Sequence, residues 1–180
     1  SSVFVRTAPI IAMAAACVDH FSQGRFILGL GSSHKVQVEG QHGLAYARPL
    51  SRVRETVEIV RELLKEGSVS YKGQVISIDS FGFAFPVYRK EMPIYLAAVF
   101  PKMLRTTGQM AQGVILTQNT LDTAREAAIQ VAQGARAAGR DPKDVEIVSM
   151  VACAVTSDPT EARNDIRRSL AYTCGYYPRY

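Results

Sequence analysis

The loop Gly29-Leu-Gly-Ser-Ser-His34 carries the residue types best suited to holding a small ligand. Gly31 lets a ligand approach the backbone closely, and Ser32 and Ser33 offer hydroxyl and N–H groups to a phosphate or to the edge of a flavin ring. The loop lacks the third glycine of Gly-x-Gly-x-x-Gly, and no Gly-Lys-Ser/Thr follows it, so neither nucleotide-binding motif is present. A turn with only a structural role fits these residues equally well.

Two further loops also follow predicted strands. In Ala97-Ala-Val-Phe-Pro-Lys102, small residues run into a helix N-terminus, whose unpaired N–H groups favour an anion. The same small residues also suit tight packing of a strand against a helix. In Thr117-Gln-Asn-Thr120 the polar side chains suit a ligand, although Asn119 or Thr120 also suits a helix cap. Ligands bind outside the carboxyl ends of parallel strands, so these loops form the candidate site.

His34 is the one titratable residue beside the glycine and serine loop, which suggests a general acid or a hydrogen-bond donor. The alternative is a solvated loop histidine. His20, at the end of an apolar helix, is interpreted as structural, and His42 lies in a loop without an identifiable partner. The three histidines lack the spacing of metal ligands, so we predict no metal site.

The elements that position these residues alternate along the chain. Helices are predicted over Pro9–Ser22, from Pro49 to a stop at Gly67, over Lys102–Met110 and Leu121–Ala138, and from Asp158 onward. A small hairpin is expected over residues 69–78, and a loop over residues 32–48. Five strands are predicted, over Ser2–Arg6, Arg25–Gly31, Pro93–Ala98, Gly113–Thr117 and Val145–Val155.

Such alternation predicts an α/β fold with a parallel sheet and right-handed crossovers. The sheet would be either open and doubly wound or part of a (β/α)8 barrel. An ordinary barrel takes about 250 residues, more than the 180 of this sequence.

Composition excludes several classes of protein. The chain is 47% hydrophobic and 21% charged, which is typical of a folded domain and not of a disordered chain. The net charge of +5 is spread over helices with acidic partners, so nucleic-acid binding is not predicted. No apolar run is long enough for a membrane span. The three cysteines are far apart and predict no disulfide framework, which points to the cytoplasm.

Several stretches together resemble the bacterial luciferase-like monooxygenase superfamily. Residues Ala14–Gly31 follow its pattern Leu-Asp-x-x-Ser-x-Gly-Arg-x-x-Leu-Gly-x-Gly, with Val18 in place of the leucine. The resemblance continues through the helix Arg54–Leu64, the hairpin stretch Val69-Ser-Tyr-Lys-Gly73 and Pro93–Leu104, and reaches the turn Ala138–Pro142. Gln112 departs from an aspartate that is usual in the family, which we expect to affect only a helix-to-strand turn.

The resemblance implies a (β/α)8 barrel with FMN or the deazaflavin F420 as cofactor. The form Ala-Ala-x-x-Pro-Lys-Met-Leu, here Ala97–Leu104, is more similar to the F420-dependent branch, which includes methylene-tetrahydromethanopterin reductase and glucose-6-phosphate dehydrogenase. This implies hydride transfer to or from a small organic substrate. The alternatives are an FMN-dependent monooxygenase served by a separate reductase and a non-catalytic flavin-binding relative.

The resemblance also implies roles for individual residues. His34 is the candidate catalytic residue, at a position where some F420 enzymes carry a glutamate. The cofactor-binding residues implied are Gly31, Ser32, Ser33 and Gln37 on the deazaflavin side, Ala97, Ala98, Val99 and Phe100 against the phosphate, and Thr117 facing substrate or phosphate.

By the same resemblance, residues 1–180 form a single domain of about five βα units with an inserted hairpin. The first two strands and the last unit of the barrel would then lie outside the sequence. We therefore expect open sheet edges and self-association, for example as a homodimer.

Overall fold

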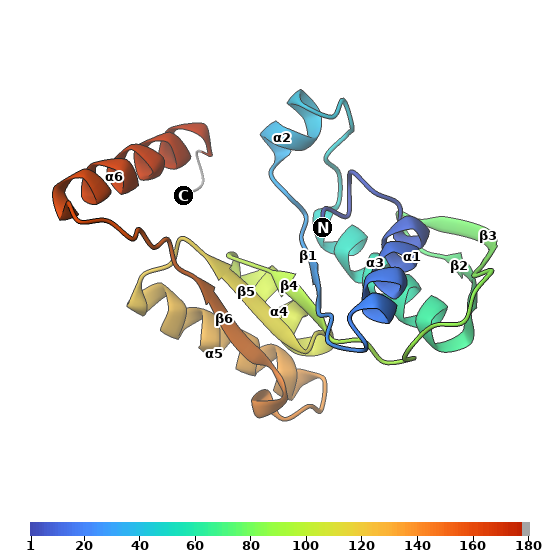
Figure 1. The fold of residues 1–180 in the computed structure, drawn as a ribbon. Coiled ribbons are helices and arrows are strands. Elements are labelled where there is room, and N and C mark those ends of the chain that lie inside the picture. Colours follow the sequence, from blue (N-terminus) through green and yellow to red (C-terminus); the bar gives the residue numbers. More distant parts are fainter. Residues whose placement is uncertain (178–180) are drawn as a thin grey trace. The chain divides into compact units, whose positions relative to one another are not determined.

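Four strands form the central sheet of the structure, a computed structural model that describes residues 1–177 (Figure 1). Their order is β1 (Leu28–Leu30), β4 (Ile94–Ala97), β5 (Gly113–Thr117) and β6 (Glu146–Met150). β1 and β5 both run parallel to β4, with Leu30 opposite Leu96 and Leu96 opposite Val114. β1, β4 and β5 are largely buried apolar runs because helices cover parallel sheets, whereas most of β6 is exposed. The α/β class and the parallel pairing are confirmed.

The predicted strand over Ser2–Arg6 is wrong. Only Ser2 pairs with the sheet, through an isolated parallel bridge to Gly31. The Ser2 hydroxyl accepts hydrogen bonds from the N–H groups of Phe4 (3.3 Å) and Val5 (3.4 Å). Such local bonds from a serine bend the backbone into a turn and compete with strand pairing. The side chains of Val3 and Phe4 are nevertheless buried.

Two helices and the hairpin pack as one group in the first half of the chain. Helix α1 (Ala8–Phe21) packs against α3 (Pro49–Glu66), which begins with proline and ends at Gly67 in a left-handed conformation, as predicted. The predicted hairpin forms, with antiparallel strands β2 (Ser68–Lys72) and β3 (Ser77–Gly82), but its second strand begins later than predicted because residues 74–76 lie in the turn.

A buried carboxylate fastens the hairpin to α3. Glu55 accepts hydrogen bonds from the backbone N–H groups of Gln74 (2.8 Å), Val75 (3.1 Å) and Ile76 (2.8 Å) in the turn of the hairpin. A Cβ added to Gly73 would lie 2.4 Å from a Glu55 oxygen, so only glycine fits beside it. The inserted hairpin is therefore an anchored part of the fold.

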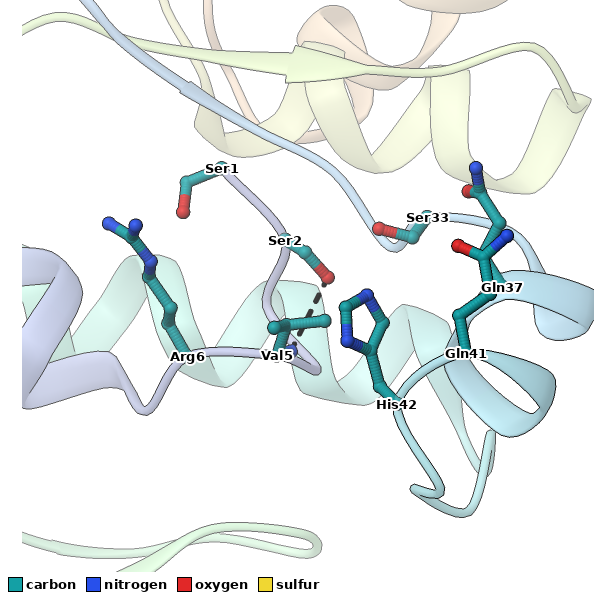
Figure 2. A pocket seen from close by; sticks show the side chains of 8 residues that line it. All are labelled: Ser1, Ser2, Val5, Arg6, Ser33, Gln37, Gln41 and His42. Carbon is teal, nitrogen blue, oxygen red and sulfur yellow. Dashed lines mark hydrogen bonds between the residues drawn. The ribbon is translucent and has the colours of Figure 1, made fainter.

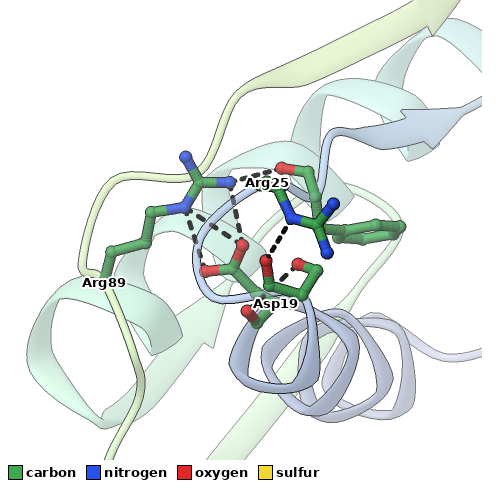
Figure 3. Close-up of polar contacts among 5 residues, drawn as sticks. Asp19, Arg25 and Arg89 are labelled. Carbon is green, nitrogen blue, oxygen red and sulfur yellow. Dashed lines mark hydrogen bonds and ion pairs between the residues drawn. The ribbon is translucent and has the colours of Figure 1, made fainter.

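An ion pair joins the end of α1 to the segment that leads into β4 (Figure 3). The buried Asp19 accepts from Arg89 at 2.9 Å to each of its two oxygens, and Arg89 also donates to the carbonyl of Phe26. Ser22 donates its hydroxyl proton to the Asp19 carbonyl, and Arg25 donates to the Ser22 carbonyl at 2.8 Å. Asp19, Ser22 and Arg25, which belong to the pattern Leu-Asp-x-x-Ser-x-Gly-Arg, therefore have structural roles.

Helices α4 (Pro101–Met110) and α5 (Leu121–Ala137) meet through glycine. A Cβ on Gly108 would lie 2.0 Å from the Val131 carbonyl oxygen, and one on Gly134 would lie 2.0 Å from that of Arg105. The two backbones thus touch where side chains would ordinarily separate them. The two helices and β5 share a core cluster of buried side chains, with Leu104, Val114 and Val131 among its members.

Gln112 occupies the turn between α4 and β5, as predicted. Its side-chain oxygen accepts from the Ile94 N–H and from Arg61, each at 3.1 Å. Its carbonyl accepts from the Glu146 N–H at 2.9 Å. The residue that departs from the family pattern thus ties three elements together at the amino end of the strands.

Two short helices were not predicted. Within the expected loop 32–48 the chain forms α2 (Lys35–Gly40), a six-residue helix with Val38 buried. Pro142–Asp144 forms a single 3-10 turn, η1, before β6. Elements this short carry too little periodicity to be recognised in a sequence.

The chain divides into two units, residues 1–149 and the residues from Met150 onward. In the second, α6 (Pro159–Tyr176) begins where predicted, because the Asp158 carboxylate accepts from the N–H groups of Thr160 (2.8 Å) and Glu161 (3.3 Å). The predicted strand Val145–Val155 ends earlier, at Met150.

Candidate functional site

The sheet brings the predicted loops to one edge. Gly31 follows β1 directly and lies beside Ala97, the last residue of β4: a Cβ added to Gly31 would be 3.2 Å from the Ala97 Cβ. Ala97 is in turn opposite Ile115, two residues before Thr117 at the end of β5. Gly31, Ala97 and Thr117 therefore lie in a row at the carboxyl ends of the three strands.

Tyr46 contacts the loop that contains Ser32 and Ser33, which we call the serine loop. Its hydroxyl donates within 3.2 Å of the Ser32 oxygen and 3.3 Å of the Ser33 carbonyl, and its ring stacks on Phe4 with centroids 4.6 Å apart. Ser33 has a φ of 56°, the left-handed conformation, so the chain turns sharply before α2. The loop is thus held in one shape by side chains that the sequence analysis did not identify.

His34 sits at the N-cap of α2 and is half-buried. Burial lowers the pKa of its imidazole below the ordinary value of 6.5. The neutral ring therefore predominates at pH 7, and a neutral imidazole both accepts and donates a proton. A role in proton transfer is compatible with this state.

The loop after β4 differs in character. The Ala98 side chain is buried and its N–H donates to the Ile115 carbonyl at 3.2 Å, so this N–H belongs to the sheet. Val99 and Phe100 are 40% and 50% exposed. Phe100 is the N-cap of α4, and its side chain makes no capping hydrogen bond. The start of α4 thus offers backbone N–H groups beside an exposed apolar surface.

The loop after β5 caps a helix. The Thr120 oxygen accepts from the Thr123 N–H at 3.3 Å, and the Thr123 hydroxyl accepts from the Thr120 N–H at 2.8 Å. This capping box confirms the cap interpretation for Thr120. Asn119 instead accepts from the Ser149 hydroxyl at 2.9 Å. Thr117, half-buried at the strand end, is the residue of this loop that remains a ligand candidate.

A cavity of about 410 Å³ lies next to the serine loop (Figure 2). One wall is formed by Ser1, Ser2, Val5 and Arg6 from the segment before α1. The other is formed by Ser33, Gln37, Gln41 and His42. We call it the polar pocket. It contains two of the predicted cofactor residues, Ser33 and Gln37, whereas Ala97–Phe100 and Thr117 lie outside its lining.

Sequence reasoning missed most of the polar pocket. Arg6 was placed in a strand that does not form, and His42 in a loop without a partner. In the structure Arg6 and His42 line opposite walls of the same pocket. The nearest signal in the sequence is the concentration of polar residues on both sides of α2.

Within residues 1–177, no cluster of three or more His, Cys, Asp or Glu side chains is arranged to hold a metal ion. In the same residues, no helix has the length and apolarity that crossing a membrane requires.

Comparisons with known proteins give a consistent result. The family model described as luciferase-like monooxygenase matches residues 1–178. The 5,10-methylenetetrahydromethanopterin reductase of Methanolobus tindarius is 29% identical over 169 residues, covering 94% of this chain and 51% of that protein.

Two solved structures share the fold. The coenzyme F420-dependent tetrahydromethanopterin reductase of Methanopyrus kandleri superimposes with a TM-score of 0.79 at 24% identity, over 90% of this chain and 51% of the other. The monooxygenase RslO1 of Streptomyces bottropensis gives a TM-score of 0.77 at 23% identity, over 98% and 57%. The chain thus spans about half the length of these relatives, and its fold is a portion of the luciferase-like (β/α)8 barrel.

Proposed function

The chain belongs to the luciferase-like monooxygenase family, and on that premise we propose that it is part of an F420-dependent oxidoreductase that transfers hydride to or from a small organic substrate. The observation that carries this proposal is the similarity to methylenetetrahydromethanopterin reductase over 94% of the chain, together with the fold shared with an F420-dependent reductase.

The residues present fit a deazaflavin at the carboxyl edge of the sheet. Gly31 packs closely on Ala97, where an added Cβ would lie 3.2 Å from the Ala97 Cβ, so the loops that follow β1 and β4 start next to each other and could contact one ligand. Ser32, Ser33 and Gln37 would hold its polar edge. The loop Ala97–Phe100 would receive the phosphate, through Val99 and Phe100 and the uncapped start of α4, because the Ala98 N–H is engaged in the sheet.

When bound, the deazaflavin supplies a carbon centre that accepts or gives up a hydride. His34 would hold or release the proton that accompanies this transfer, from an imidazole that burial keeps neutral at pH 7. Thr117 would contact the substrate or the phosphate from the next strand. These roles are part of the proposal.

Cofactor binding tests the proposal first. Purified protein is titrated with F420 and separately with FMN, and quenching of cofactor fluorescence gives each dissociation constant. We expect F420 to bind at least tenfold more tightly than FMN. Turnover is then followed as loss of deazaflavin absorbance with candidate hydride donors, and as its recovery when reduced F420 meets methylenetetrahydromethanopterin or another candidate acceptor. Tighter binding of FMN would contradict the proposal.

The second candidate function is an FMN-dependent monooxygenase. It is favoured by the fold shared with the monooxygenase RslO1 over 98% of the chain. Preferential binding of FMN, with substrate oxidation that requires oxygen and a reductase, would support this function instead.

We also propose self-association, because β1 and β6 form the two ends of the described sheet and Ile147 and Met150 are exposed on β6. Sedimentation velocity tests this, and a well-folded monomer at all concentrations would contradict it. A reducing cytoplasm is proposed as the location, since Cys17, Cys153 and Cys174 are all unpaired and exposed.

A further inference from the structure

The lining of the polar pocket contains one arginine and no acidic residue. Arg6 is its only permanently charged lining residue, and the rest of the lining comprises hydroxyls, two amides, one imidazole and Val5. No carboxylate lines it. Within residues 1–177 no carboxylate forms an ion pair with Arg6, and Glu39, the acidic residue of neighbouring α2, is paired with Lys35 at 3.8 Å.

Figure 2 shows Arg6 at one end of the lining, Gln37 and Gln41 at the other, and His42 between them. The arginine thus lies at the end of the lining away from Gln37 and Gln41.

From this arrangement we propose that the polar pocket is a substrate subsite for an oxyanion, a carboxylate or a phosphate ester, with Arg6 as its charge partner. The proposal rests on the proposed function for the meaning of substrate. A guanidinium matches the two oxygens of such a group with two N–H donors, and the surrounding hydroxyl and imidazole groups supply further hydrogen bonds. A volume of about 410 Å³ suits a small organic molecule.

The position of the pocket favours the substrate over the cofactor as the source of the anion. The lining includes Ser33 and Gln37, which would hold the polar edge of the deazaflavin, but none of Ala97–Phe100, the loop proposed for the cofactor phosphate. An anion at Arg6 would thus be bound apart from the loop proposed for the cofactor phosphate. It would fix one end of a molecule whose reactive part points along the loop toward Gly31.

Calorimetric titration with inorganic phosphate at low ionic strength tests the proposal. We compare the wild type with Arg6→Gln, with Arg6→Lys, and with Arg136→Gln as a matched loss of an exposed arginine on α5. Because Arg6→Gln removes the charged hydrogen-bond donor, it should weaken phosphate binding about tenfold or more. Arg6→Lys should retain most of the affinity, and Arg136→Gln all of it.

Equal affinities for Arg6→Gln and Arg136→Gln would overturn the proposal, as would absence of phosphate binding in the wild type. Because the Arg6 side chain is exposed, we expect all variants to share the wild-type unfolding temperature, and this is measured in parallel.

A second arm repeats the phosphate titration with F420 at saturation. Unchanged phosphate affinity supports a substrate subsite, and competition would overturn it in favour of the cofactor's own anionic groups. Since F420 binding is followed separately by fluorescence, a protein that fails to bind F420 contradicts the proposed function while leaving the Arg6 comparison interpretable.

Discussion

The loop after β1 and the loop after β4 lie next to each other at one edge of the sheet, but they present different chemistry. The first offers side chains: two serine hydroxyls, His34 and, across the polar pocket, Arg6. The second offers backbone N–H groups at the start of α4 and an exposed apolar surface. If the proposed function holds, we expect the side chains of the first loop to determine which substrate reacts and the backbone of the second to bind the cofactor phosphate.

Removing the imidazole of the first loop gives the largest expected effect. His34→Ala should lower kcat by roughly 10²–10⁴, the usual range for a general acid or base. His20→Ala, which removes an imidazole that packs on Tyr88 away from the loops, is the matched control and should leave kcat unchanged. Steady-state kinetics with F420 decides. A change confined to KM would make His34 a binding residue.

Breaking the Asp19–Arg89 ion pair should destabilise the fold that carries both loops. Asp19→Ala leaves Arg89 without its partner in a buried setting, which costs about 3–5 kcal/mol of unfolding free energy. Asp122→Ala, in the exposed pair with Arg125, should cost less than about 1 kcal/mol. Urea unfolding measures both. Similar losses for the two variants would show that the Asp19 pair does not secure the scaffold.

An acidic side chain in the second loop should weaken cofactor binding without preventing folding. Ala97→Glu places a negative charge beside the start of α4, and we expect F420 affinity to fall well over tenfold through steric and electrostatic conflict. Ala97 is exposed, unlike the buried Ala98, so the variant should fold. Ala137→Glu, also exposed, is the control. Equal F420 affinities in these two variants would remove this loop from the site.

The smallest effect concerns pH. Because the pKa of His34 is lower in the folded chain than its ordinary 6.5, the unfolded chain binds more protons in the interval between the two values. Stability should therefore rise with pH through this interval and fall on acidification below about pH 6.5. His34→Gln should reduce this slope, as measured by unfolding temperatures between about pH 5 and 7. An unchanged slope would contradict the assignment to His34.

The sequence predicted the regular elements better than the site. Pro49 and Gly67 mark α3 because proline suits the first turn and glycine the left-handed end, and the run before Gly31 reads as a covered parallel strand. The turn at Ser2 was not predicted, because the hydrogen bonds from the Phe4 and Val5 N–H groups to the Ser2 hydroxyl outweigh the strand propensity of Val3–Val5. The polar pocket was not predicted either, because its walls come from segments that are adjacent only after folding, and no local pattern records such a contact.

The contact between Gly108 and Gly134 bears on how the second loop can be redesigned. With a Cβ only 2.0 Å from the opposing carbonyl, neither position tolerates any other residue without separating the helices. In a library of random variants both positions should stay glycine. By contrast, Val99 and Phe100, the exposed residues before α4 that we propose to lie against the cofactor, are suitable positions for substitutions that test cofactor choice.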